Sequence, residues 1–137
     1  MHNRARQGWP YADRVIAAVL LTLVLALLGV FQLALILGAP LGRFAWGGQH
    51  RVLPVGLRIG SAVGIAIYVL IALIALDRAA VVDTLPERFS AVGMWLAFAY
   101  FVLGIVMNAI SRSAPERRVM VPVTIILACA SLVIAWG

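Results

Sequence analysis

Four long stretches without a charged residue constrain the fold of this chain more than any other feature. They cover residues 15–37, 59–76, 89–111 and 119–136. Each is close to the ~20 apolar residues, within a range of about 17–25, that an α-helix needs to cross a bilayer. None alternates polar and apolar residues as a membrane β-strand does. The sequence therefore predicts an all-α fold, an integral membrane bundle of four transmembrane helices that forms one domain over residues 1–137.

Composition supports lipid as the solvent. Hydrophobic residues make up 64% of the chain and charged residues 12%, whereas a soluble domain carries about 45–50% and about 25%. The first stretch also exceeds the about 7–15 apolar residues of a signal-peptide core. We therefore expect it to be retained as a spanning helix, in a multi-pass protein of the plasma (cytoplasmic) membrane.

The formal charge of +6 comes from arginines at the edges of the apolar stretches, with no dense basic run. This placement favours contact with anionic lipid headgroups and argues against a nucleic-acid partner. Positive-inside counting compares five arginines on one side with six on the other. The first side has Arg4, Arg6, Arg14, Arg78 and Arg88, and the second has Arg43, Arg51, Arg58, Arg112, Arg117 and Arg118. This near-tie points the first and third loops to the cytoplasm but leaves the orientation unresolved.

The least generic part of the chain is the loop at 38–58, where Gly, Pro, Trp, Gln, His and Arg gather between two apolar stretches. Pro40 and Pro54 are expected to end the flanking helices. The loop is either a structural hairpin corner or a contact for a partner protein. The candidate contact residues are Trp46, Gln49, His50 and Arg51.

Small residues predict where helices approach one another. Gly56, Gly60 and Gly64 follow the G-x-x-x-G spacing, which puts all three on one helix face. That face would pack against another helix of the same chain or against a second copy. A second packing stripe in the last helix is formed by Thr124, Ala128, Ser131 and Ala135.

The segments 84–87 and 113–116 share the pattern S/T-x-P-E. In this pattern the Ser or Thr caps the start of a helix and the Glu bonds back to it. We therefore expect capped turns before the third and fourth helices. Pro122 is expected to kink the fourth helix or to mark its true start.

Polar residues within the spans suggest a groove along the third helix. Tyr100, Gly104, Asn108 and Arg112 recur at i, i+4 steps, so Tyr100, Asn108 and Arg112 could line a polar path from one surface. The alternative is that these side chains hydrogen-bond across helices. All five acids lie at or beyond the ends of the spans, which leaves no carboxylate at the membrane centre.

We predict no catalytic, cofactor-binding or metal site. His2 and His50 lie on separate segments, and Cys129 is the only cysteine. No ligand spacing for zinc and no nucleophile with a paired base is present in the sequence.

The loop carries GAPLG at 38–42, WGG at 46–48 and LPVGLRIGS at 53–61. This pattern resembles small bacterial four-helix integral membrane proteins for which no function is assigned. The resemblance implies the same helix count over the whole chain and no activity or site residues.

Two classes of function remain open. The first is a non-enzymatic accessory or scaffolding protein that packs through its small-residue faces, as a homo-oligomer or on a larger membrane partner. The alternative is a small transporter or channel, which would act alone or as an oligomer. An enzyme ranks third, because the acid–base groups of an active site are not found together.

Overall fold

The computed structural model describes residues 9–137 and contains four long α-helices within them. They are α1 (Tyr11–Ile36), α2 (Val55–Arg78), α3 (Glu87–Ala109) and α4 (Ala114–Trp136), and two short 3-10 helices, η2 (Gly42–Phe44) and η3 (Trp46–Gly48), lie between α1 and α2. No strand occurs in this range. All four α-helices are long and apolar enough to cross a membrane. The predicted all-α bundle is therefore confirmed.

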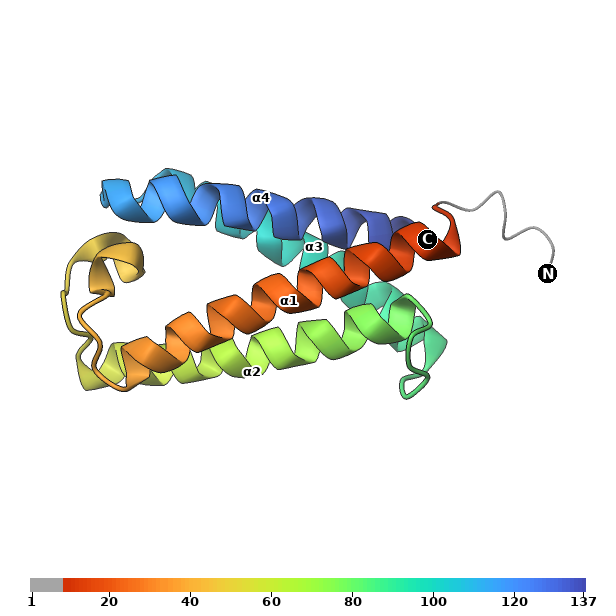
Figure 1. Cartoon of the computed structure of the whole chain (residues 1–137), viewed down its shortest axis with the longest axis horizontal. Coiled ribbons are helices and arrows are strands. Elements are labelled where there is room, and N and C mark those ends of the chain that lie inside the picture. The colour runs from red at the N-terminus through yellow and green to blue at the C-terminus, as the bar shows by residue number, and fades with distance from the viewer. Residues whose placement is uncertain (1–8) are drawn as a thin grey trace.

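The helices form two hairpins, α1 with α2 and α3 with α4, and the most extensive packing lies within each hairpin. The hairpins meet where α1 packs on α4 and α2 on α3. Figure 1 shows α1 and α4 side by side near Gly137 and diverging towards the other end. That other end carries residues 37–54 and the short α3–α4 turn, and we call it the loop end.

The helices begin earlier than predicted at 15, 59, 89 and 119. α2 starts directly after Pro54, so Arg58 lies within its first turns. The Arg58 side chain turns back to the loop, and its Nε donates to the Leu53 carbonyl at 2.8 Å. α4 starts at Ala114, so Pro122 lies inside the helix and is not its start. The charged residues that bound the apolar stretches, such as Arg58 and Arg118, therefore lie inside the helices and do not mark their ends.

Only one of the two predicted caps forms. The Ser113 Oγ accepts from the Glu116 amide at 3.3 Å at the start of α4. The Glu116 side chain does not return to Ser113, whose amide donates instead to the Ser111 Oγ at 3.1 Å. The prediction for Thr84 is wrong. Its amide, like that of the next residue, donates to the Asp77 carboxylate at 2.8 Å, and Pro86 is the N-cap of α3.

The core lies where the hairpins meet and is built from small and aliphatic side chains. Ala18, Leu21 and Ala75 are fully buried there. The predicted stripe on α4 is confirmed as a packing seam, because Thr124, Ala128, Ser131 and Ala135 are all buried. Cys129 on the same helix is exposed.

Ser131 provides a test of the seam. Its hydroxyl is buried and has no hydrogen-bond partner among the described residues, so Ser131→Ala should leave stability unchanged or raise it. Ser131→Leu should overpack the seam and cost about 1–3 kcal/mol. Thermal unfolding in detergent measures both, with Cys129→Leu on the exposed face as control. Equal stability of the two leucine variants would contradict the assigned seam.

Candidate functional site

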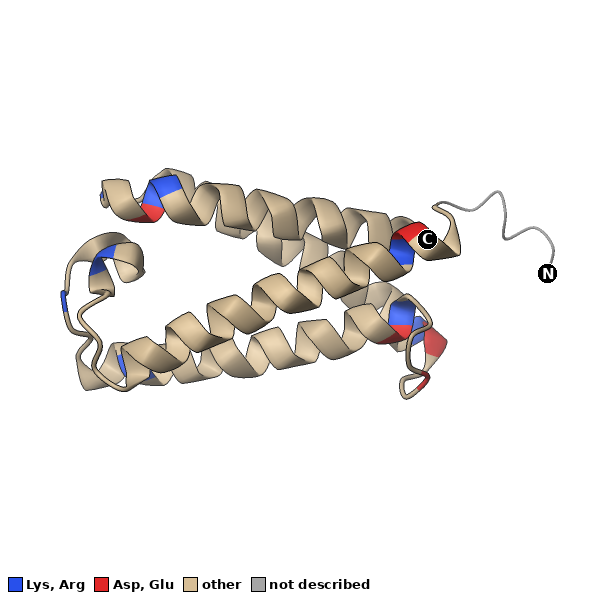
Figure 2. Cartoon of the chain, in the orientation of Figure 1, with Lys and Arg blue, Asp and Glu red and all other residues tan. Residues whose placement is uncertain are grey.

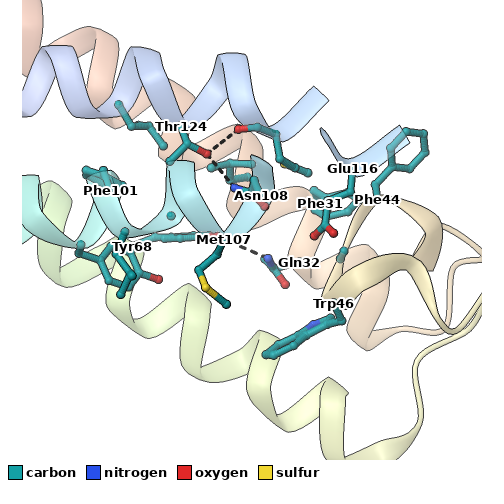
Figure 3. Close-up of a pocket in the computed structure, with 17 residues that line it drawn as sticks. Phe31, Gln32, Phe44, Trp46, Tyr68, Phe101, Met107, Asn108, Glu116 and Thr124 are labelled. Atoms are coloured by element: carbon teal, nitrogen blue, oxygen red, sulfur yellow. Dashed lines mark hydrogen bonds between the residues drawn. The ribbon is translucent and has the colours of Figure 1, made fainter. Parts of the chain in front are cut away.

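A pocket of about 350 Å³ lies between the two hairpins towards the loop end. Figure 3 shows side chains from the helices and from residues 44–46 around it. All four α-helices and residues 44–46 contribute to the lining. The residues that matter for its chemistry are Phe31, Gln32, Phe44, Trp46, Tyr68, Tyr100, Phe101, Met107, Asn108, Glu116, Met120 and Thr124.

Hydrogen bonds between the polar lining residues stay within each hairpin. Gln32 Nε2 donates to the Tyr68 hydroxyl at 3.4 Å, which links α1 to α2. Asn108 Nδ2 donates to Thr124 Oγ1 at 3.0 Å, which links α3 to α4 (Figure 3). Neither bond joins one hairpin to the other, so the space between the hairpins is not bridged by these groups.

One acceptor of the pocket is unused. Gln32 Oε1 is buried and has no hydrogen-bond partner among residues 9–137. A buried amide oxygen without a partner costs about 1–3 kcal/mol. A bound molecule or water that donates to this oxygen would recover part of that cost.

Among the described residues that line the pocket, Glu116 is the only one with a carboxylate, and this residue is only 7% exposed. Its Oε1 accepts a bond from the Gly47 amide at 3.2 Å and a short bond from the Ser111 hydroxyl. Both recorded bonds reach the same oxygen. The lining contains no arginine or histidine among the residues that the structure describes.

Residues 42–48, which we call the lid, cover the pocket at the loop end. The Trp46 indole Nε1 donates to Ser61 Oγ of α2 at 3.3 Å. On the other side, the Ser113 hydroxyl donates to the Arg43 carbonyl and Glu116 accepts from Gly47. The lid is therefore attached to α2 by one side-chain hydrogen bond and to the start of α4 by two.

The lid backbone requires glycine at its tip. Gly47 and Gly48 have φ of 76° and 71°, and a Cβ on Gly48 would lie 2.5 Å from the Ser113 side chain. Trp46 also has a positive φ, of 53°. A positive φ is uncommon for a non-glycine residue and points to strain held by its surroundings. Those surroundings are Ser61, which bonds the indole, and Gly60, on which the indole packs.

Of the four residues predicted as loop contacts, only Trp46 lines the pocket. Gln49, His50 and Arg51 are exposed at the loop end. His50 and Arg51 contact the lid through their main-chain carbonyl groups. The Arg51 carbonyl accepts from the Gly42 amide at 2.9 Å, and the His50 carbonyl lies where a Gly42 side chain would project.

Within residues 9–137, the three glycines of α2 do not pack against another of the long α-helices. A Cβ on Gly60 would lie 2.8 Å from the Trp46 indole, and nothing lies within 4 Å of the position on Gly56 or Gly64. Of the three glycines, Gly60 is therefore the one that the lid contacts, through the Trp46 indole. Packing of the other two against a second copy stays a prediction.

Two residues of the predicted groove reach the pocket. Tyr100 and Asn108 line it together with Gly104, whereas Arg112 is exposed outside it. Sequence reasoning missed Glu116, which the S/T-x-P-E pattern assigned to a cap. Glu116 lies four residues before Met120 and eight before Thr124, so all three lie on the same, inward face of α4. This spacing could have indicated from the sequence that Glu116 faces the pocket.

Charges divide unevenly between the two ends of the bundle (Figure 2). Among residues 9–137 the loop end carries six arginines, Arg43, Arg51, Arg58, Arg112, Arg117 and Arg118, with Glu116 as its acid. The opposite end carries Arg14, Arg78 and Arg88 with Asp13, Asp77, Asp83 and Glu87. Arg4, Arg6 and His2 lie outside the described residues.

No protein-family model, curated protein or solved structure matches the chain. Within the described residues, no three His, Cys, Asp or Glu side chains come together as a candidate metal site.

The contact between Gly60 and Trp46 can be tested by substitution. Gly60→Ala should displace the indole, because its Cβ would lie 2.8 Å from the ring. Gly64→Ala is the matched control, since nothing lies within 4 Å of its Cβ, and it should raise helix stability by up to about 1 kcal/mol. The emission of Trp46, as the single tryptophan left after Trp9, Trp95 and Trp136 are replaced by Phe, reports its environment. An unchanged emission in Gly60→Ala would contradict the lid position.

Proposed function

We propose that this chain is a non-enzymatic membrane protein that binds a small amphipathic molecule in the pocket beneath the lid. The observation that carries the proposal is the unbridged pocket with polar groups from both hairpins, in a chain whose spans are otherwise apolar. Polar groups within a membrane span are costly and usually mark a functional path. The cavity volume of about 350 Å³ lies within the ~300–1,000 Å³ of small-molecule pockets.

The same geometry favours a carrier over a passive scaffold. Each hairpin satisfies its polar pair internally, through Gln32–Tyr68 in one and Asn108–Thr124 in the other. Movement of one hairpin relative to the other would therefore leave these two bonds intact and would break the lid bonds Gly47–Glu116 and Ser113–Arg43 instead. The lid covers the pocket at the loop end and is held on α4 by two hydrogen bonds, to Glu116 and Ser113, so opening these two bonds would give a bound molecule a route to that surface.

An accessory or scaffolding role is the second candidate, and the open glycines of α2 favour it. Gly56 and Gly64 leave space for close approach of another helix. The partner in this proposal is a second copy of the chain or a larger membrane protein, surrounded by anionic lipid headgroups. Binding in the pocket and assembly through α2 are compatible, because Gly56 and Gly64 do not line the pocket.

For the location we propose a bacterial plasma membrane with the loop end in the cytoplasm. The bacterial origin rests on the resemblance of the 38–61 pattern. By the positive-inside rule, six arginines at the loop end against five on the other side of the membrane favour this orientation by one residue. Reporter enzymes fused after Gly137 test it. Activity of the fusion outside the cytoplasm is expected, and activity only inside would reverse the orientation.

Thiol labelling tests whether the pocket holds water. In a Cys129→Ala background, Met107→Cys should react with a water-soluble maleimide at least about tenfold faster than Val106→Cys, because a thiol needs water to ionise. The two residues are matched, at 58% and 51% exposed, but only Met107 lines the pocket. Equal rates at both positions would show that the pocket is as dry as the lipid face.

Substitution of the open glycines tests assembly. Gly64→Ile should abolish a homo-oligomer that packs through this face, since the side chain would keep a neighbouring backbone away. Ala66→Ile, at an exposed position on the opposite side of α2, is the control. The mass in detergent, from light scattering, gives the oligomeric state. A wild-type monomer, or an oligomer that survives in Gly64→Ile, would remove this interface.

A further inference from the structure

We infer that the molecule bound in the pocket is a hydrophobic cation, with Glu116 as its counter-ion. This inference rests on the proposed binding function and adds the charge and character of the ligand. Three features of the pocket carry it: a buried carboxylate with no basic group in the same lining, one carboxylate oxygen without a recorded bond, and aromatic rings around the cavity.

The first feature concerns charge. A buried carboxylate is costly unless it is paired and hydrogen-bonded. Glu116 is only 7% exposed, and no arginine or histidine belongs to the described lining. Its neighbours Arg117 and Arg118 are exposed on the outside of the bundle, and Arg117 Nη1 donates to the Ser111 carbonyl at 2.6 Å. The pocket thus has a negative charge that a positively charged ligand would balance.

The second feature concerns geometry. The Gly47 amide and the Ser111 hydroxyl both donate to Oε1 of Glu116. These two bonds hold the carboxyl group in place from the lid side and the helix side. Oε2 has no recorded partner in the described chain, so it is the oxygen available to a ligand.

The third feature concerns the shape and polarity of the walls. Phe31, Phe44, Trp46, Tyr68 and Phe101 belong to the lining, and Figure 3 shows Phe31 and Phe44 beside Glu116. One face of the Phe44 ring is already covered by the Arg43 guanidinium, at 4.9 Å from the ring centre. Aromatic faces attract desolvated cations, as in the recognition of quaternary ammonium groups. The same walls exclude a strongly hydrated inorganic cation, which would lose its water without gaining a full set of oxygen ligands.

An anion does not fit this site. A lipid phosphate or a carboxylate ligand would face Glu116 with like charge in a region of low dielectric constant. A neutral amphipathic molecule would fill the walls but leave the charge of Glu116 unpaired. The observations therefore favour a cation with an apolar body.

Equilibrium dialysis against the full chain in zwitterionic nanodiscs tests the inference, with empty nanodiscs to subtract partition into lipid. The probes are benzyltrimethylammonium and its neutral isostere neopentylbenzene, which differ only in nitrogen against carbon. The wild type should bind the cation at least about tenfold more tightly than the isostere, a ratio that a desolvated ion pair with aromatic contacts readily supplies. Glu116→Gln should remove that preference, whereas Glu87→Gln, at an exposed position at the opposite end, should leave it unchanged.

Two results of this experiment would overturn the cation assignment. Equal or tighter binding of neopentylbenzene by the wild type overturns the cation assignment, and the comparison needs no variant that must fold. Retention of the preference in Glu116→Gln also overturns it, because the amide keeps an acceptor for Gly47 and Ser111 but has no charge. In both cases saturable binding still supports the pocket itself. If neither probe binds and Met107→Cys is unreactive, the proposed function fails together with the inference.

Discussion

Within the hydrocarbon core of a bilayer, every main-chain polar group has to find its partner inside the protein, because lipid offers none. The four helices meet this constraint through their own ladders. Residues 37–54 lie outside the α-helices, so their main-chain groups take other hydrogen-bond partners. The lid obtains them from Arg51, which accepts from Gly42, and from Ser113 and Glu116 at the start of α4. A loop between α1 and α2 is thus tied to the opposite hairpin, and this tie covers the pocket.

The tie also explains why Glu116 points inwards. A glutamate in the first turn of a helix ordinarily interacts with its own free amide groups. Here Ser113 caps α4 alone, so the carboxylate remains free to accept from Gly47, far away in the chain. The bond from Gly47 and the burial of this carboxylate at the pocket occur together. Glu116 therefore has two roles: it holds the lid through Gly47, and it supplies the carboxylate of the pocket.

Much of the fold could be predicted from the sequence, because the length and apolar character of each stretch are local properties. The helix count and the buried stripe on α4 follow from them. The ends of the helices were less predictable: α2 begins directly after Pro54, so Arg58 lies inside it, and the long Arg58 side chain reaches back to the Leu53 carbonyl. The site depends on contacts between distant segments. Tyr100 and Asn108 were found by their spacing, whereas the pairing of Gly47 with Glu116 leaves no mark in either local pattern.

The exchange rate of the Gly47 amide hydrogen, measured by NMR in detergent, tests the central claim that Glu116 holds the lid over the pocket. We predict that this amide exchanges at least about tenfold more slowly than a solvent-exposed loop amide, since a hydrogen-bonded amide exchanges only when it opens. Replacement of Glu116 by Ala should remove the protection at Gly47 while the amide groups in the middle of α1 keep theirs. An unprotected Gly47 amide in the wild type, or protection that survives Glu116→Ala, would contradict the account.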